Sequence, residues 1–179
     1  MWLKPFVAII LFYFFAILQN SFFTHFVFSG GVLNLIFILF FLFVFFENKR
    51  NYYWIFFYAV IAGLFLDMFS YASLGISIVL LVIIAFLIKK TQFLLKEEKN
   101  DSSLVYFVLL FSVFFVLYSL LFQVCIFIFI VPHVFSKFNL SFIVEIIYNL
   151  IFAVLAFFIC KRLVKEKIDN RQMPLSFKK

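Results

Sequence analysis

The chain has 179 residues, of which 68% are hydrophobic and 13% are charged, whereas ordinary soluble domains are about 45–50% apolar and about 25% charged. This composition excludes an ordinary soluble domain and indicates a membrane protein. The net charge of +7 therefore predicts attraction to anionic lipid headgroups, and we expect no nucleic-acid partner for so apolar a chain.

Six apolar runs follow one another along the chain. A bilayer core of about 30 Å requires about 20 helical residues, and the second and fourth runs are shorter than that, so these two could instead form a re-entrant pair. The first run is too long for a signal-peptide core and lacks an Ala-x-Ala site, so we expect it to be retained. The runs predict helices over about 6–28, 32–46, 53–70, 74–89, 104–130 and 142–160.

The basic residues predict how these helices are oriented. With the N-terminus inside and six crossings, every Lys and Arg except Lys137 falls on the cytoplasmic side, as the positive-inside rule requires. The sequence therefore predicts an all-α integral membrane bundle with both termini in the cytoplasm. It would comprise a transmembrane domain over residues 1–164 and a basic cytoplasmic tail over 165–179.

Several polar side chains fall at one depth, in the predicted outer half of the bundle. Polar groups are costly in hydrocarbon and usually face the bundle interior, so we expect a polar cluster there, either closed or open as a cavity. A purely architectural role, in which these groups bind one another and fix the helix register, is the alternative. The residues are Gln19, Asn34, Asp67, Gln123, Glu145 and Asn149.

The segment GLFLDMFSYASLG ends the third predicted helix and begins the fourth. Ala59, Gly63 and Asp67 are spaced by four, which predicts a strip of small residues that allows another backbone to approach closely. Asp67 lies at a helix C-terminus, where the macrodipole disfavours an anion. We expect the free N–H groups that begin the next helix to offset this cost, with Gly75 as a tight-turn residue between the two helices.

Other donors and neighbours remain possible for this acid. The amides of Gln19 and Asn34 are alternative donors to Asp67, and Glu145 is a second acid at the same depth. Two neighbouring acids would not both ionise readily.

The chain lacks the residue patterns of a recognisable catalytic or metal centre. Cys125 and Cys160 fall in different helices at opposite depths, so we expect no disulfide. His25 and His133 are isolated and belong to no metal-ligand motif. We therefore expect no enzyme activity, no catalytic residue, no metal and no cofactor.

Four segments, in this order, resemble the family of rod shape-determining MreD proteins: LQNS, VLNLIFIL, GLFLDMFSYASLG and IVEIIYNLIFA. The most specific piece is Gly63-x-x-x-Asp67-x-x-Ser70 followed by Leu74-Gly75. The family often has a Pro-Asp pair where this chain has Leu33-Asn34, so the acid of that pair has no counterpart at this position.

The resemblance implies a scaffold without catalytic activity in the inner membrane of a rod-shaped bacterium. Such proteins act in the cell-wall elongation complex with MreC, the actin-like MreB, a polymerase and its transpeptidase partner. The MreD family is similar in fold to the S components of energy-coupling-factor vitamin transporters. The alternative function for this chain is therefore that of a substrate-binding S component. In that case the outer polar cluster would be a vitamin site, but Ala8 and Ala16 do not form the Ala-x-x-x-Ala contact motif typical of S components.

Overall fold

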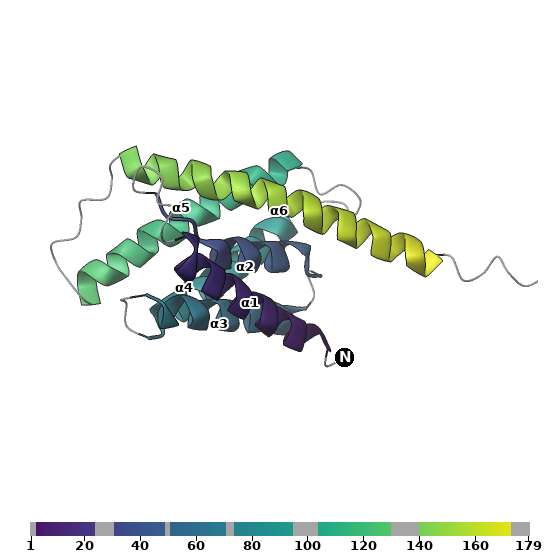
Figure 1. Ribbon diagram of the computed structural model, residues 1–179, viewed down its shortest axis with the longest axis horizontal. Coiled ribbons are helices and arrows are strands. Elements are labelled where there is room, and N and C mark those ends of the chain that lie inside the picture. The colour runs from purple at the N-terminus through teal and green to yellow at the C-terminus, as the bar shows by residue number, and fades with distance from the viewer. Residues whose placement is uncertain are drawn as a thin grey trace, which may run out of the picture.

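The computed structural model describes residues 3–23, 31–48, 51–70, 74–94, 104–129 and 140–172, and these ranges contain six α-helices (Figure 1). The chain is an all-α membrane bundle, as predicted. Four helices, α1, α4, α5 and α6, are long and apolar enough to cross a membrane, whereas α2 and α3 are shorter apolar helices. The helices are α1 (Leu3–Ser21), α2 (Leu35–Phe46), α3 (Tyr52–Met68), α4 (Ile76–Leu94), α5 (Leu104–Phe129) and α6 (Leu140–Gln172).

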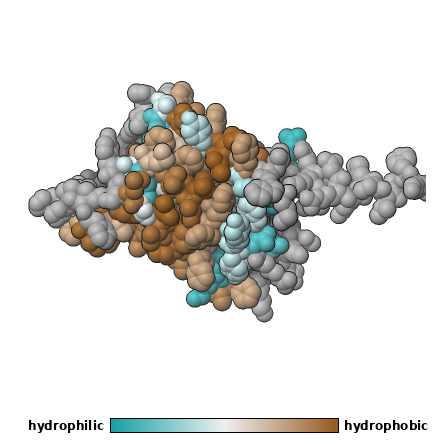
Figure 2. Space-filling model, turned by 90° about the horizontal axis from the view of Figure 1, so that it is seen from below, coloured by the Kyte–Doolittle hydropathy of each residue, from teal (hydrophilic) through white to brown (hydrophobic). Residues whose placement is uncertain are grey.

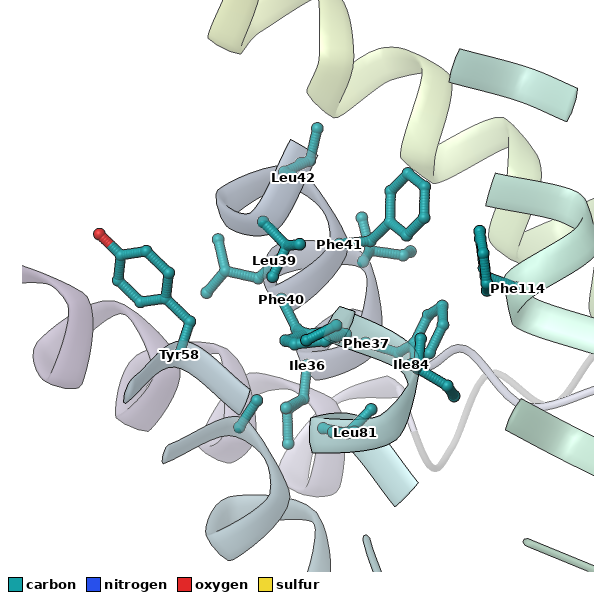
Figure 3. Packing of buried hydrophobic residues seen from close by; sticks show 14 of the residues in the cluster. Ile36, Phe37, Leu39, Phe40, Phe41, Leu42, Tyr58, Leu81, Ile84 and Phe114 are labelled. Carbon is teal, nitrogen blue, oxygen red and sulfur yellow. The ribbon is translucent and has the colours of Figure 1, made fainter. Parts of the chain in front are cut away.

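Helix α2 is the centre of the bundle. Ten of its 12 residues are buried, and it packs against α1, α3, α4 and α6. Figure 3 shows its side chains pointing in several directions, toward Tyr58 of α3, toward Leu81 and Ile84 of α4, and toward Phe114 of α5. A helix that is apolar on every side is expected to be buried on every side. At 1.5 Å per residue its length is about 18 Å, which is shorter than a bilayer core of about 30 Å.

Phenylalanine rings fill the space between α2 and α5. Within each helix the rings four residues apart are nearly parallel, and between the helices they meet edge to face, with centroids 5.2 Å apart for Phe41–Phe111 and for Phe45–Phe107. Aromatic pairs of this kind contribute about 0.5–1.5 kcal/mol beyond their buried area. The two rows consist of Phe37, Phe41 and Phe45 on α2, and Phe107, Phe111 and Phe115 on α5.

Helices α3 and α4 form the closest helix pair through the predicted strip of small residues. A Cβ atom added to Gly63 would lie 2.4 Å from the Cα atom of Ile78, a separation that real Cβ atoms essentially never show. Ala59 and Ala62 are fully buried beside it. The prediction that Gly63 permits a close backbone approach is therefore confirmed, and the approaching backbone belongs to α4.

The outward-facing surface is apolar, as expected for contact with lipid. Helix α1 exposes Phe6, Ile10, Tyr13 and Phe14, and Figure 2 shows a broad hydrophobic area bordered by more polar residues on one face of the molecule.

Two helices continue beyond the ranges predicted for them. Helix α4 runs past residue 89 to Leu94, because Lys89 and Gln92 find polar partners inside the bundle. Helix α6 continues to Gln172 and so includes the first part of the predicted tail over 165–179. Two helices are shorter than predicted: α1 ends at Ser21 and does not reach residue 28, and α2 begins at Leu35 and not at residue 32. Residues 24–28 of the first predicted helix lie outside the described residues.

Candidate functional site

Three side chains converge on the beginning of α2, one from α1, one from α6 and one from the N-cap residue that precedes α2. The Asn34 side chain, at the N-cap, accepts a hydrogen bond from the Phe37 amide at 2.9 Å. Gln19 of α1 accepts one from the Ile36 amide at 3.2 Å through its Oε1 atom. Asn149 of α6 accepts one from the Asn34 amide at 2.7 Å. We call Gln19, Asn34 and Asn149 the α2 cap.

Asn149 also donates hydrogen bonds to carbonyl groups through its amide nitrogen. Its Nδ2 atom donates to the Val32 carbonyl and to the Glu145 carbonyl, both at 2.9 Å. The side chain is fully buried, so its oxygen and its nitrogen both bind backbone groups. Asn149 thereby connects α6 to the segment that leads into α2.

The physical reason for this cap is that α2 begins among buried residues, since Leu33, Ile36 and Phe37 are each at most 1% exposed. The first N–H groups of any helix lack partners within the helix, and an unpaired polar group in hydrocarbon costs several kcal/mol. Water cannot satisfy them at a buried helix end. The amide side chains of the α2 cap do so instead.

Asp67 performs the same task for α4. Its Oδ2 atom accepts from the Gly75 amide at 2.7 Å and its Oδ1 atom from the Ser77 amide at 3.0 Å. Asp67 is 2% exposed. Its carboxylate lies at the positive end of the α4 dipole, which favours an anion. The expectation that the start of the fourth helix offsets the cost of this acid is therefore confirmed. We call Asp67, Gly75 and Ser77 the α4 cap.

Gly75 has a conformation that explains its residue type. Its φ angle is +106°, a region that side chains disfavour and glycine adopts freely. The Gly75 carbonyl also accepts the first helical hydrogen bond of α4, from Val79 at 3.1 Å. Its predicted role as a turn residue is confirmed.

The remaining predicted residues occupy separate positions. The Ser70 amide donates to the Asp67 carbonyl at 3.3 Å, closing the last turn of α3. Glu145 is half-buried on α6, and its backbone lies against Gly31, where an added Cβ would approach the Glu145 nitrogen to 3.0 Å. Gln123 is half-buried near the end of α5. Four residues of the predicted cluster are thus divided between two caps, with Gln19, Asn34 and Asn149 at α2 and Asp67 at α4. The caps do not include Gln123 and Glu145.

A second polar group, at the other end of α2, had no counterpart in the predictions. The Lys89 Nζ atom donates to the Glu47 carbonyl and to the Gln92 Oε1 atom, both at 2.9 Å, while Gln92 donates to the Phe45 carbonyl at 3.4 Å. Lys89 and Gln92 are each 3% exposed. They supply donors to the unpaired carbonyls that end α2, where a positive charge is also favoured by the dipole.

The Glu47 carboxylate belongs to the same group. It accepts hydrogen bonds from Tyr58 at 3.3 Å and from Asn51 at 3.2 Å. From the sequence Lys89 is one of several basic residues expected in a cytoplasmic loop. The signal that distinguishes it is the pair Lys89 and Gln92, three residues apart and therefore on one face of a helix.

Within the described ranges, His, Cys, Asp and Glu side chains form no group of three or more that could hold a metal ion. Cys125 and Cys160 are both free and half-buried. The polar groups of the two caps bind backbone amides and carbonyls, so they act by satisfying the hydrogen bonds at the beginnings of α2 and α4. Comparison with protein families, with curated proteins and with solved structures finds no match to this chain.

Asn149→Leu is expected to destabilise the bundle strongly. The apolar side chain leaves the Asn34 amide and the Val32 carbonyl unpaired, at about 1–3 kcal/mol for each buried group. Thermal unfolding of the detergent-solubilised protein measures the loss. Ile147→Ala, at an exposed position on the same helix, is the control, and equal stability of the two variants would contradict the cap.

Lys89→Met is expected to lower the free energy of unfolding, whereas Lys90→Met is not. The first variant removes charged donors from the Glu47 carbonyl and Gln92, and hydrogen bonds to charged groups contribute about 1.5–3 kcal/mol. Lys90 is exposed. Chemical unfolding of both variants in the same detergent tests the difference, and a loss of stability in the Lys90 variant as large as in the Lys89 variant would count against a specific role at the end of α2.

Proposed function

We propose that this chain is a non-enzymatic scaffold in the cytoplasmic membrane that maintains rod cell shape as a member of the cell-wall elongation complex. In this proposal it crosses the membrane several times with both ends in the cytoplasm. Its partners are an MreC-like periplasmic protein and, through the complex, an MreB-like filament and the polymerase and transpeptidase pair.

The observation that supports this function is that residues in the segments resembling MreD proteins make the contacts between helices. Gly63 lets α4 approach α3, and Asp67 binds the beginning of α4. Asn34 and Asn149 bind the beginning of α2. Gly63 and Asp67, from the most specific segment of the resemblance, thus hold α3 and α4 together, which suits a protein whose function is to hold others in place.

The same observation weighs against the vitamin-carrier alternative. A binding pocket needs polar groups that converge on a ligand, whereas the oxygen atoms of Gln19, Asn34 and Asp67 accept hydrogen bonds from backbone amides of α2 and α4. These side chains stabilise the ends of two helices. Their oxygen atoms therefore already have partners within the protein, which weighs against a role in binding a vitamin.

Depletion of the protein in its own host tests the proposal. We expect depleted cells to lose rod shape and become round, and a second copy of the wild-type gene to restore the rods. Cross-linking of a tagged chain in intact membranes should recover an MreC-like protein. Rod-shaped growth after complete depletion would refute the scaffold.

The carrier alternative predicts a different result from the purified protein. A vitamin bound by the protein would raise its thermal unfolding temperature, because a ligand that binds only the folded state stabilises it. We expect no shift with a panel of water-soluble vitamins. A reproducible shift with one of them would favour the carrier over the scaffold.

A further inference from the structure

The exposed side chains of α3 change in character along the helix. After its first turn they are apolar, as at Phe56 and Leu64. In its first turn they are Tyr52, which is 60% exposed, and Tyr53, which is 77% exposed, followed by the half-buried Trp54. The apolar surface of α3 therefore ends in aromatic rings that carry a hydroxyl or an indole N–H group.

The end of α4 lies beside these rings and adds a lysine. Glu47 joins the two helices, because its carbonyl accepts a hydrogen bond from Lys89 of α4 and its carboxylate accepts one from Asn51, the N-cap residue of α3. Lys90 is the next residue on α4 and is exposed. Tyr52 directly follows Asn51, so Lys90 and the aromatic rings lie at the same end of the α3–α4 pair.

Helix α1 brings a second exposed lysine to this end. Phe12 packs against Phe43 with ring centroids 5.6 Å apart, and Gln19 binds the Ile36 amide, so α1 and α2 run in opposite directions. The exposed Lys4, in the first turn of α1, therefore lies toward the end of α2. Figure 2 shows polar residues along the border of the broad hydrophobic area. Aromatic rings with polar tips and lysines thus gather at one end of the bundle.

We propose that this end of the bundle lies in the headgroup layer of one leaflet, with lipid phosphates as the partners of its lysines. Tyr and Trp are enriched at this depth of a membrane because their rings are apolar and their tips bind polar groups. Lysine side chains extend from an apolar stem toward the same boundary. We call Lys4, Tyr52, Tyr53, Trp54 and Lys90 the headgroup anchor.

The order of the residues favours lipid over a soluble protein as the partner. Tyr53 is only three residues from the exposed Phe56, so the aromatic rings directly continue the surface that hydrocarbon covers. The opposite end of the described part of α3 lacks this order, because its exposed residues are Met68 and Phe69. The headgroup anchor therefore belongs to one leaflet.

The headgroup anchor also indicates the depth of the polar group at the end of α2. The buried Lys89 and Gln92 are neighbours of Lys90 in α4, and Glu47 binds Asn51 beside Tyr52. These polar groups would then lie at the boundary of the hydrocarbon, where a charge costs less than at the membrane centre. This inference does not depend on the proposed function.

Fluorescence quenching in lipid vesicles tests the depth of the headgroup anchor. The chain has two tryptophans, and Trp2→Phe with Trp54→Phe gives a background in which Tyr53→Trp supplies all the tryptophan fluorescence. Leu64→Trp in the same background is the matched control, because Leu64 is exposed on the same helix and lies about 16 Å farther along it at 1.5 Å per residue. The vesicles contain phosphatidylcholine and phosphatidylglycerol, with a nitroxide either on the headgroup or at the middle of an acyl chain.

We expect the headgroup nitroxide to cause the larger loss of fluorescence in Tyr53→Trp and the acyl-chain nitroxide the larger loss in Leu64→Trp. The native Trp54, measured in the single variant Trp2→Phe, should also lose more fluorescence to the headgroup nitroxide. Stronger quenching of Tyr53→Trp by the acyl-chain nitroxide would overturn the proposal. Quenching by aqueous iodide without quenching by either lipid would also overturn it, since that result indicates a surface that faces water or a soluble protein.

Discussion

Replacing Gly63 with alanine is expected to force α3 and α4 apart and to cause a large loss of stability. The new Cβ would lie 2.4 Å from the Cα atom of Ile78 and 2.7 Å from its nitrogen. These are backbone atoms, which cannot move aside as the end of a flexible side chain can. Overpacking of a core typically costs about 1–3 kcal/mol, and we expect Gly63→Ala to reach the upper end of that range.

The measurement is the free energy of unfolding in detergent, together with the amount of protein inserted in the membrane. Leu64→Ala is the matched control, because Leu64 is the next residue on α3 and is 40% exposed. A Gly63→Ala protein as stable as the Leu64→Ala protein would show that α3 and α4 are not in close contact.

Removing the Asp67 carboxylate is expected to have the second large effect. Asp67→Ala leaves the Gly75 and Ser77 amides without acceptors, at about 1–3 kcal/mol for each buried group. Asp67→Asn keeps one oxygen and so should lose less. We expect stability to fall in the order wild type, Asn variant, Ala variant, measured by chemical unfolding, and equal stability of all three would rule out the cap.

The Asn variant also separates the acid's structural role from its cellular role. Under the proposed function, Asp67→Asn should weaken maintenance of rod shape while the protein remains inserted in the membrane. Microscopy of cells that carry only this variant, with protein abundance measured in parallel, gives the result. Normal rods at normal abundance would show that the charge of Asp67 is dispensable for shape.

The contacts between neighbours in the chain were the most predictable from sequence. Asp67 and Gly75 are eight residues apart, with a polar break between two apolar runs, so the end of one helix and the start of the next had to meet. Gly63 is predictable for a similar reason, since small residues spaced by four mark a close helix contact. The existence and order of all six helices followed from the length of the apolar runs.

The central position of α2 was not predictable in the same way. Its residues are apolar throughout, so no periodic pattern distinguishes a buried side from a lipid-facing side. Its caps come from far along the chain: Asn34 and Asn149 are 115 residues apart, and Lys89 lies 42 residues from Glu47. Pairing over such distances depends on how the helices pack, and a single sequence contains no direct signal for it.

The enclosure of α2 also bears on the order in which the protein is assembled. The ribosome makes this 12-residue helix second, yet the side chains that satisfy its ends belong largely to α4 and α6, which are made later. Until Lys89, Gln92 and Asn149 are in place, the Asn34 amide and the Phe45 and Glu47 carbonyls lack the side-chain partners that they have in the complete bundle. We therefore expect α2 to take its final position only after α4 and α6 have been made.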